Sequence, residues 1–268
     1  WLKRVAEDRN WHVYIEDRSD QLACLGLWGP NALKIIQAVA DVPRELDPAN
    51  FPFATTKEIT VQGIPVLAFR ISYVGEAGWE LHILFSYGLS LWDLIFEQGA
   101  TPVGVETYAN SRRLEKSFRL QNADLLTEYN LIEAGLARPT VKDADFHGKS
   151  AYITQRALDS QPAYLCTLTM TDNRDQSGVE RYPVGTCPIV DPDSSEVLVD
   201  ELGRRSYTTS IAYGPSVGKN VALAYLPKAY AEEGRELLLE YFDEPFPIKV
   251  EAIGCKGLYD PENLLPRQ

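Results

Sequence analysis

The sequence has 268 residues and a mass of 30.0 kDa, with 45% apolar and 24% charged residues, so it is large enough to bury a sizeable core. Its 26 basic and 38 acidic residues leave a net charge of −12, and a field of this sign repels phosphate backbones and anionic lipids. No apolar run approaches the roughly 18 residues that span a bilayer. We therefore expect neither a nucleic-acid partner nor a membrane partner.

Cysteines and histidines are few and scattered: Cys24, Cys166, Cys187, Cys255, His12, His82 and His147. No two cysteines have C-x-x-C spacing and no two histidines are four residues apart, so the spacing predicts neither a disulfide framework nor a metal centre. Without a disulfide pattern, the expected location is cytoplasmic, or the mitochondrial matrix if the source is eukaryotic.

The sequence begins with Trp1 rather than Met, and residues 1–11 show neither a secretory signal nor a transit-peptide pattern. We therefore expect the chain to begin inside a longer protein. The sequence does not predict the oligomeric state.

The first half of the chain alternates helical and strand patterns. Asn31 is a candidate N-cap for a helix over residues 32–40, and a second helix is expected over residues 89–97, ended by Gly99. Strands are expected, the first of them buried, at residues 21–27, 58–61, 64–71 and 80–85. This order favours a layered architecture of the α/β or α+β class.

The pattern changes near residue 160, where short alternating runs separated by Gly, Pro and Asp replace the helices. These runs cover residues 164–169, 197–199, 207–211, 222–225, 236–241 and 248–253. Such a series is typical of a small all-β barrel or sandwich. We predict an α+β fold with a first domain over residues 1–160 and an all-β barrel domain over residues 161–268.

The segment at residues 70–81 runs from a strand through two glycines, Gly75 and Gly78, into another strand. Glycines permit a tight turn and a close approach of the backbone to a ligand. Strand alternation places Trp79 on one face and Glu80 on the other, so a carboxylate is presented beside an aromatic ring. Such a pair suits a flat heterocycle with paired N–H donors, and a plain hairpin with solvated carboxylates is the alternative.

Residues 108–120 carry several cations in an acidic protein. Helical spacing places Arg112, Glu115 and Arg119 together, with Arg113 one position around. The group is either a local positive pocket for an anionic ligand or an amphipathic helix with internal ion pairs.

Residues 206–227 predict two strands joined by a Gly-Pro turn. Their glycines lack the spacing of a phosphate-binding loop, so Gly218-Lys219 alone does not indicate a phosphate site. The chain also lacks a G-x-S-x-G nucleophile motif, and Cys255 has no histidine near it in the sequence. Nucleophilic catalysis is therefore not indicated.

Several segments together resemble one family, the tetrahydrofolate-dependent aminomethyltransferases of the glycine cleavage T-protein type, which includes the folate domains fused to dimethylglycine and sarcosine dehydrogenases. The matching segments are residues 73–81, 113–115, 132–136, 146–149, 209–210, 218–219 and 222–227. Their order and spacing cover nearly the whole chain. The closing residues 258–261 are similar to the tail of the dehydrogenase-fused members.

The resemblance implies a folate domain that cradles the pterin, followed by a small β-barrel domain. It implies that Glu80 pairs with the N3–H and the 2-amino group of the pterin. It also implies that Tyr73 and Trp79 line the pocket, that Arg113 lies at the folate site, and that Glu76 either binds folate or fixes the loop. The catalytic aspartate of the family belongs to a portion upstream of the aligned residues, so no catalytic residue is assigned.

The implied reaction transfers a one-carbon unit from a small-molecule donor of the methylamine or aminomethyl type to tetrahydrofolate. In a dehydrogenase fusion acting on an N-methylated glycine-type substrate, FAD in a portion that precedes this chain would oxidise the N-methyl group. Arg112 and Arg113 are candidates for holding the anionic glutamyl tail, because the overall field is negative. Three functions stay open: a module of a demethylating dehydrogenase, a free-standing aminomethyltransferase or O- or S-demethylase, and a non-catalytic folate-binding protein. An upstream G-x-G-x-x-G fingerprint would separate the first from the second.

Overall fold

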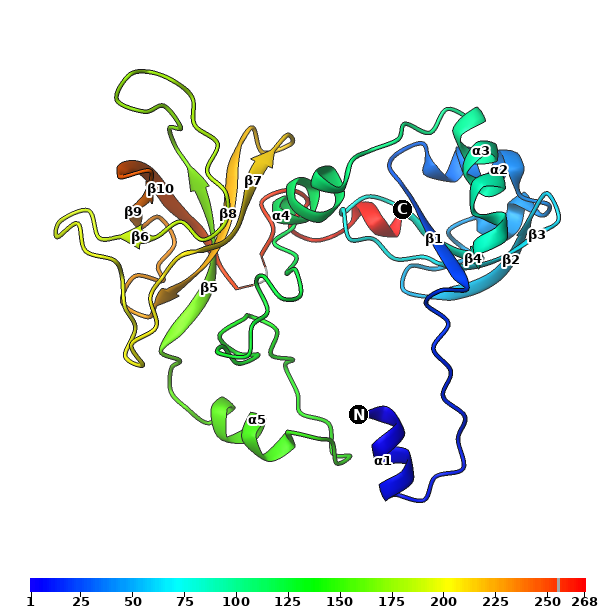
Figure 1. The fold of residues 1–268 in the computed structure, drawn as a ribbon, viewed down its shortest axis with the longest axis horizontal. Coiled ribbons are helices and arrows are strands. Elements are labelled where there is room, and N and C mark those ends of the chain that lie inside the picture. The colour runs from blue at the N-terminus through cyan, green and yellow to red at the C-terminus, as the bar shows by residue number, and fades with distance from the viewer. Residues whose placement is uncertain (255) are drawn as a thin grey trace. The chain divides into compact units, whose positions relative to one another are not determined.

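The computed structural model describes residues 1–254 and 256–268 (Figure 1). Cys255, one of the scattered cysteines, lies outside these residues. The described chain divides into two compact units. The N-terminal unit comprises Trp1–Ser72, Glu76–Pro102 and Pro266–Gln268, and the barrel unit comprises Tyr73–Gly75 and Val103–Leu265. Within the described residues, no helix has both the length and the apolar character that a membrane crossing requires.

The N-terminal unit contains an antiparallel sheet, and the helices over residues 32–39 and 88–97 share its core (Figure 1). Its helices and strands are, in chain order, α1 (Leu2–Asp8), β1 (Leu22–Trp28), α2 (Ala32–Val39), β2 (Thr56–Val61), β3 (Ile64–Phe69), β4 (Gly78–Leu84) and α3 (Gly88–Glu97). The strands lie in the order β1-β4-β3-β2. Ile36 of α2 and Leu91 of α3 share one hydrophobic core with Val66 and Leu81 of the sheet.

Local sequence explains these elements. The apolar spacing of α2 buries Ile36 and Val39, and Asn31 occupies its N-cap, although its side chain caps no backbone N–H among the described residues. Gln62 and Gly63 have φ of 46° and 76°, as in the tight hairpin turn whose twist matches paired strands such as β2 and β3. The helices and strands expected in this half are confirmed, with ends shifted by one or two residues. Helix α1 was not expected.

The expectation that the first strand is buried is wrong. Cys24 and Gly26 of β1 are exposed. The reason is that β1 forms the edge of the sheet, and these two residues point away from the helices that cover the other face.

The barrel unit contains the remaining strands, which follow a long segment with few regular elements. A π-helical turn over Glu106–Arg112 runs into the short helix α4 (Arg113–Glu115). The remaining elements are α5 (Lys149–Arg156), β5 (Ala163–Met170), β6 (Ile189–Val190), β7 (Thr208–Gly214), β8 (Lys219–Pro227), β9 (Glu236–Tyr241) and β10 (Glu244–Ile253). The strands pair antiparallel in the order β6-β9-β10-β5-β8-β7.

Backbone hydrogen bonds close this sheet into a barrel. The Ile189 N–H donates to the Ser206 carbonyl at 3.0 Å, and the Thr208 N–H donates to the Cys187 carbonyl at 2.9 Å. These bonds join the segment of β6 to that of β7, the two strands at opposite ends of the pairing order. The two end strands are therefore bonded to each other and the sheet has no unpaired edge, which is the definition of a closed barrel. The predicted all-β barrel is confirmed.

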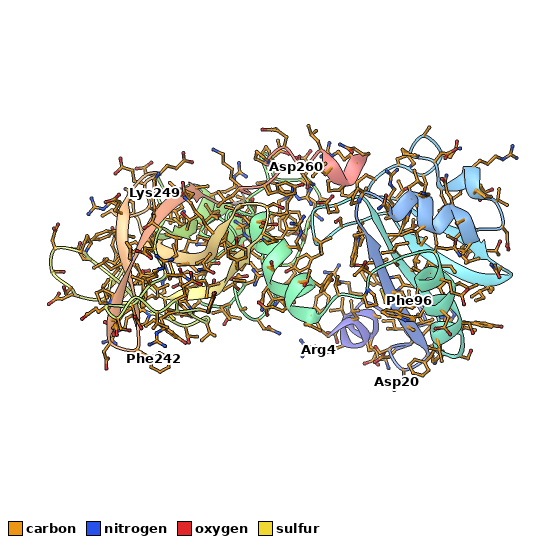
Figure 2. The ribbon with its side chains drawn as sticks, turned by 90° about the horizontal axis from the view of Figure 1, so that it is seen from above. Arg4, Asp20, Phe96, Phe242, Lys249 and Asp260 are labelled. Atoms are coloured by element: carbon orange, nitrogen blue, oxygen red, sulfur yellow. The ribbon has the colours of Figure 1, made fainter. Side chains whose placement is uncertain are left out.

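Two details of the barrel differ from the expected pattern. Residues 197–199 form isolated bridges through Val197 and Val199 rather than a strand. The turn between β9 and β10 has positive φ at Phe242 and Asp243, with the Phe242 ring exposed at the tip (Figure 2). This turn lacks the Asn and Gly residues that usually mark such a hairpin in a sequence.

Candidate functional site

Strand β4 presents Glu80 on the face of the sheet opposite the helices. Its burial alternates, with Trp79, Leu81 and Ile83 in the core and Glu80 and His82 turned outward. The predicted division of Trp79 and Glu80 between opposite faces is confirmed, since successive strand side chains point to opposite faces. The Glu80 side chain keeps 23% of its surface exposed and is accessible to a ligand.

Trp79 belongs to the core of the N-terminal unit. Its side chain is only 1% exposed, lies 6.4 Å from the Phe51 ring and sits under the Arg70 guanidinium at 5.7 Å. The indole Nε1 has no hydrogen-bond partner among the described residues. Within this unit, Trp79 therefore supports β4 from beneath Glu80.

Other aromatic rings accompany Glu80 on its own face. Phe69 of β3 stands directly opposite Glu80 in the strand register. On the other side Glu80 faces Gly26 of β1, and the Trp28 ring covers that glycine so closely that a methyl group there would come within 2.1 Å of it. The Trp28 indole is fixed by donating to the Ile71 carbonyl at 2.9 Å. Glu80 is thus flanked by Phe69 and by the glycine under Trp28.

Sequence reasoning missed Phe69 and Trp28. The alternation of residues 64–69 places Phe69 outward, and that of residues 22–28 places Trp28 outward, but neither pattern says which residue of β4 lies opposite. That information comes from the strand register.

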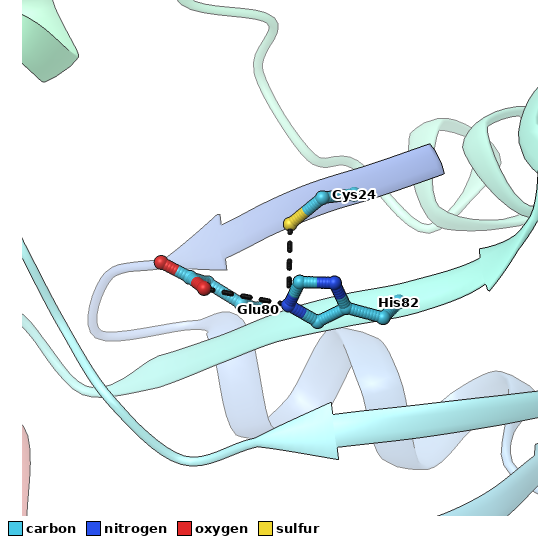
Figure 3. A group of neighbouring side chains, drawn as sticks. All are labelled: Cys24, Glu80 and His82. Carbon is cyan, nitrogen blue, oxygen red and sulfur yellow. Dashed lines mark hydrogen bonds and ion pairs between the residues drawn. The ribbon is translucent and has the colours of Figure 1, made fainter. Parts of the chain in front are cut away.

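Glu80 has acceptor capacity that the described chain does not use. His82 Nε2 lies 3.5 Å from Glu80 Oε2, beyond an ordinary hydrogen bond, and no described residue donates a shorter one to this carboxylate (Figure 3). Cys24 of β1 lies beside Glu80 and His82. Desolvation by the packed strands and then the charge of Glu80 raise the pKa of the Cys24 thiol.

Glu76 lies in the segment that leads into β4. It is half-buried, and two residues later Gly78 opens the strand with φ of +153°. A Cβ on Gly78 would lie 2.0 Å from the Leu27 carbonyl oxygen, so only glycine lets β4 start this close to β1.

Tyr73 belongs to the barrel unit, where a hydrogen bond and contacts with other aromatic rings hold its side chain. The hydroxyl donates to the Arg119 carbonyl at 2.9 Å, and the ring lies 5.4 Å from Tyr108 and 6.1 Å from Phe118, stacked on the latter. Burial raises the pKa of Tyr73, an effect that the positive charge of Arg113 opposes.

Arg113 is fully buried in a polar network. Its guanidinium donates to Asp124 at 2.6 Å and to the Ser210 hydroxyl at 2.6 Å, and its Nε donates to the Ala109 carbonyl at 2.6 Å. The Ser210 hydroxyl in turn donates to Asp124 at 2.8 Å, and Thr209 also bonds this carboxylate. The structure thus places Arg113 where it joins the α4 segment to β7.

The neighbouring charges form ion pairs. Arg112 pairs with Glu115 at 2.6 Å. Glu115 is itself buried and accepts hydrogen bonds from the backbone N–H groups of Ser216 and Val217 in the β7–β8 turn. Arg119 lies beyond the helix and donates to the Ala134 carbonyl at 3.0 Å. Of the two readings left open for residues 108–120, internal ion pairing describes Arg112 and Glu115.

The candidate residues thus divide between the units. Glu76, Trp79 and Glu80 belong to the N-terminal unit, whereas Tyr73 and Arg113 belong to the barrel unit. Trp79, Tyr73 and Arg113 are held by aromatic or ionic contacts within their own units, whereas Glu76 and Glu80 are partly exposed.

Family models match most of the chain. The GCVT N-terminal domain covers residues 1–143, and the glycine cleavage T-protein C-terminal barrel domain covers residues 165–253. The chain is 32% identical to human mitochondrial dimethylglycine dehydrogenase over 92% of its own length and 27% of that protein. It is 31% identical to an aminomethyltransferase of Symbiobacterium thermophilum over 88% of its own length and 60% of that protein.

The fold has a solved counterpart. The glycine cleavage system aminomethyltransferase T of Bartonella henselae superposes with a TM-score of 0.69 at 21% identity, covering 93% of this chain and 63% of that one. The chain therefore spans only part of each of these relatives. Because the first family model covers more than half of the chain and the second covers the barrel, the chain belongs to the glycine cleavage T-protein family.

Proposed function

We propose that this chain binds tetrahydrofolate and serves in the transfer of a one-carbon unit to it, as a module of a demethylating enzyme that acts on an N-methylated glycine-type substrate. The observation that carries the proposal is the Glu80 carboxylate, which is partly exposed, flanked by aromatic residues, and given no ordinary hydrogen bond by a described residue. The family membership and the likeness to dimethylglycine dehydrogenase and aminomethyltransferases support it.

The residues present fit a pterin. The pyrimidine edge of a pterin presents an N–H and an amino group side by side, and a carboxylate accepts such a pair with two parallel hydrogen bonds. The Phe69 ring and the Trp28 ring supply flat apolar surface on the same face of the sheet. In this proposal Glu80 makes the direct contact, and Trp79 supports its strand from the core.

The other candidate residues have proposed roles around the folate. Tyr73 contributes a wall of the folate pocket, and Glu76 either contacts folate or orders the loop before β4. Arg113 stays a candidate for the folate site as the holder of a polar network within the barrel unit, and Arg112 stays a candidate for the glutamyl tail. The ionic contacts of Arg113 with Asp124 and Ser210 support a positioning role for it.

Tetrahydrofolate, when bound, supplies the nitrogen that receives the one-carbon unit. The task of this chain is then to bind the pterin, orient it and exclude water. We further propose that FAD belongs to another portion of the longer protein. For the compartment we propose the cytoplasm, or the mitochondrial matrix in a eukaryote, and the described cysteines, which are free thiols, support it.

Calorimetric titration of tetrahydrofolate into the chain under anaerobic conditions tests the proposal. Glu80→Gln should weaken binding by about 1.5–3 kcal/mol, roughly 10- to 150-fold, because it removes a charged hydrogen-bond acceptor. Glu97→Gln, which changes an exposed carboxylate on α3 of the same unit, is the matched control and should leave affinity unchanged. Equal affinity of the wild type and Glu80→Gln would remove Glu80 from the site.

A further inference from the structure

Three side chains of different chemistry converge on the outward face of the N-terminal sheet. Cys24 of β1 and His82 of β4 are directly opposite in the strand register, and Glu80 lies two residues before His82 on the same face (Figure 3). A sulfur, a ring nitrogen and a carboxylate oxygen from these residues all lie within 4.8 Å of one another. The sequence spacing predicted no metal centre because the cysteine is 58 residues from the histidine, and only the strand pairing brings them together.

A hydrogen bond between Cys24 and His82 accounts for only part of this convergence. The same atom, His82 Nε2, faces Cys24 Sγ at 3.7 Å and Glu80 Oε2 at 3.5 Å. An imidazole nitrogen carries at most one hydrogen, so it cannot donate fully to both neighbours. The Nε2–Oε2 distance is also longer than an ordinary hydrogen bond. When Nε2 accepts from the Cys24 thiol it has no hydrogen to give to Glu80, so no single tautomer satisfies all three of these potential cation ligands.

Two of the three distances between these atoms fit tetrahedral coordination, and the third is at most 4.8 Å. Zinc binds sulfur at about 2.3 Å and nitrogen or oxygen at about 2.0–2.1 Å, so neighbouring ligand atoms around it lie roughly 3.3–3.6 Å apart. The observed 3.7 Å and 3.5 Å are within 0.2 Å of this range. Paired strands supply a rigid frame, because Cys24 and His82 are cross-strand neighbours.

We propose that Cys24, Glu80 and His82 form a binding site for a zinc-class divalent cation, with three protein ligands and a fourth position open to water or another small ligand. The thiolate and the imidazole favour zinc over magnesium or calcium, which prefer oxygen ligands. Cys24 is exposed and the His82 and Glu80 side chains keep 28% and 23% of their surface exposed, so an ion can enter from solvent.

The metal site needs nothing from folate binding. One consequence does rest on the proposed function: a bound cation and a pterin compete for the Glu80 carboxylate, so zinc would inhibit folate binding. For this reason the test is carried out without folate, and its failure leaves the folate proposal untouched.

Metal titration of the chelator-treated chain tests the site. Competition with a chromophoric chelator should give one zinc ion per chain, and Co²⁺ should produce the sulfur-to-metal charge-transfer absorption of a thiolate ligand. Cys24→Ser should abolish that absorption, and both Cys24→Ser and His82→Gln should weaken zinc binding at least about tenfold.

His12→Gln, which changes an exposed histidine outside the cluster, is the matched control and should bind zinc as the wild type does. Far-UV circular dichroism checks that each variant stays folded. Absence of zinc binding at about 100 μM free metal, or wild-type affinity and absorption in Cys24→Ser, would overturn the proposal.

Discussion

Arg113 and Asp124 form an ion pair in which both side chains are fully buried. Transfer of two charges out of water is costly, and the remaining hydrogen-bonding groups must be satisfied for such a pair to persist. Here the Asp124 carboxylate also accepts hydrogen bonds from Ser210 and from the Leu120 backbone N–H. The pair therefore fixes the segment after α4 against β7.

Removal of Arg113 should destabilise the fold, because a buried Asp124 carboxylate without its cation is costly. Arg113→Met leaves the Asp124 carboxylate buried without its cation, so we expect the free energy of unfolding to fall by about 3–5 kcal/mol. Arg174→Met, which breaks a 3.8 Å pair between exposed side chains, should change it by less than about 1 kcal/mol. Urea unfolding followed by far-UV circular dichroism measures both. Similar losses of unfolding free energy in the two variants would show that the buried pair stabilises the fold no more than an exposed pair does.

Asp175 should make stability depend on pH. The Ser177 hydroxyl, the Val179 backbone N–H and the Arg181 guanidinium hold its pKa at about 2, below the usual 3.8. A carboxyl whose pKa is lowered in the folded state stabilises that state above its unfolded pKa, and the contribution is lost as the carboxyl is protonated. The stability from Asp175 should therefore be full above about pH 4 and disappear as the pH falls to about 2.

Asp175→Asn isolates this contribution from the other acids. The variant should be less stable than the wild type at pH 6, and the difference in melting temperature should shrink between pH 4 and pH 2. A difference that stays constant over this range would contradict the assigned pKa.

At the residue scale the sequence predicted which way Glu80 points, because strand alternation depends on local order alone. It did not predict that Phe69 stands opposite Glu80 or that the Trp28 ring covers Gly26, since both depend on register between strands distant in sequence. For the same reason the sequence did not predict that Cys24 and His82 lie opposite each other.

Strand β4 is the element that carries the candidate site, and its start depends on Gly78. Its φ of +153° is unfavourable for any other residue, and an added methyl group would press against β1 backbone atoms. Gly78→Ala should cost about 1–3 kcal/mol for the backbone conformation, with a further cost from the clash.

The control for this change is Gly63→Ala in the β2–β3 turn. Gly63 also has positive φ, but no described atom lies within 4 Å of its Cβ position, so a loss of only about 1 kcal/mol is expected. All five tryptophans belong to the N-terminal unit, so tryptophan fluorescence during urea unfolding reports on this unit. Equal losses in the two variants would show that close packing against β1 is unimportant.

Helical elements were predicted less well where their ends depend on backbone detail. The spacing of residues 108–120 suggested one helix, but α4 ends at Glu115. Ser117 adopts φ of +53°, and the Phe118 N–H bonds the Arg113 carbonyl while the Ser117 N–H bonds the Leu114 carbonyl, the pattern that ends many helices at a glycine. With serine in that position, the sequence contains no stop signal.

At the scale of the whole molecule, the change of pattern near residue 160 predicted the barrel, because repeated short strands with frequent turns fit few other folds. The division at residue 160 stays a prediction. The two family models leave residues 144–164 between them, whereas the compact units divide the chain after Pro102. Residues 103–162 therefore precede the barrel strands in sequence but pack with them, as the contacts of Arg113 and Glu115 with β7 and its turn illustrate.

The proposed function depends most on binding of the pterin head of a reduced folate by Glu80. A crystal structure of this chain soaked with tetrahydrofolate measures that directly. We predict that both Glu80 carboxylate oxygens accept hydrogen bonds of about 2.7–3.1 Å from the N3–H and the 2-amino group of the pterin. Folate bound at another site, with the Glu80 carboxylate still facing only His82 and Cys24, would contradict it.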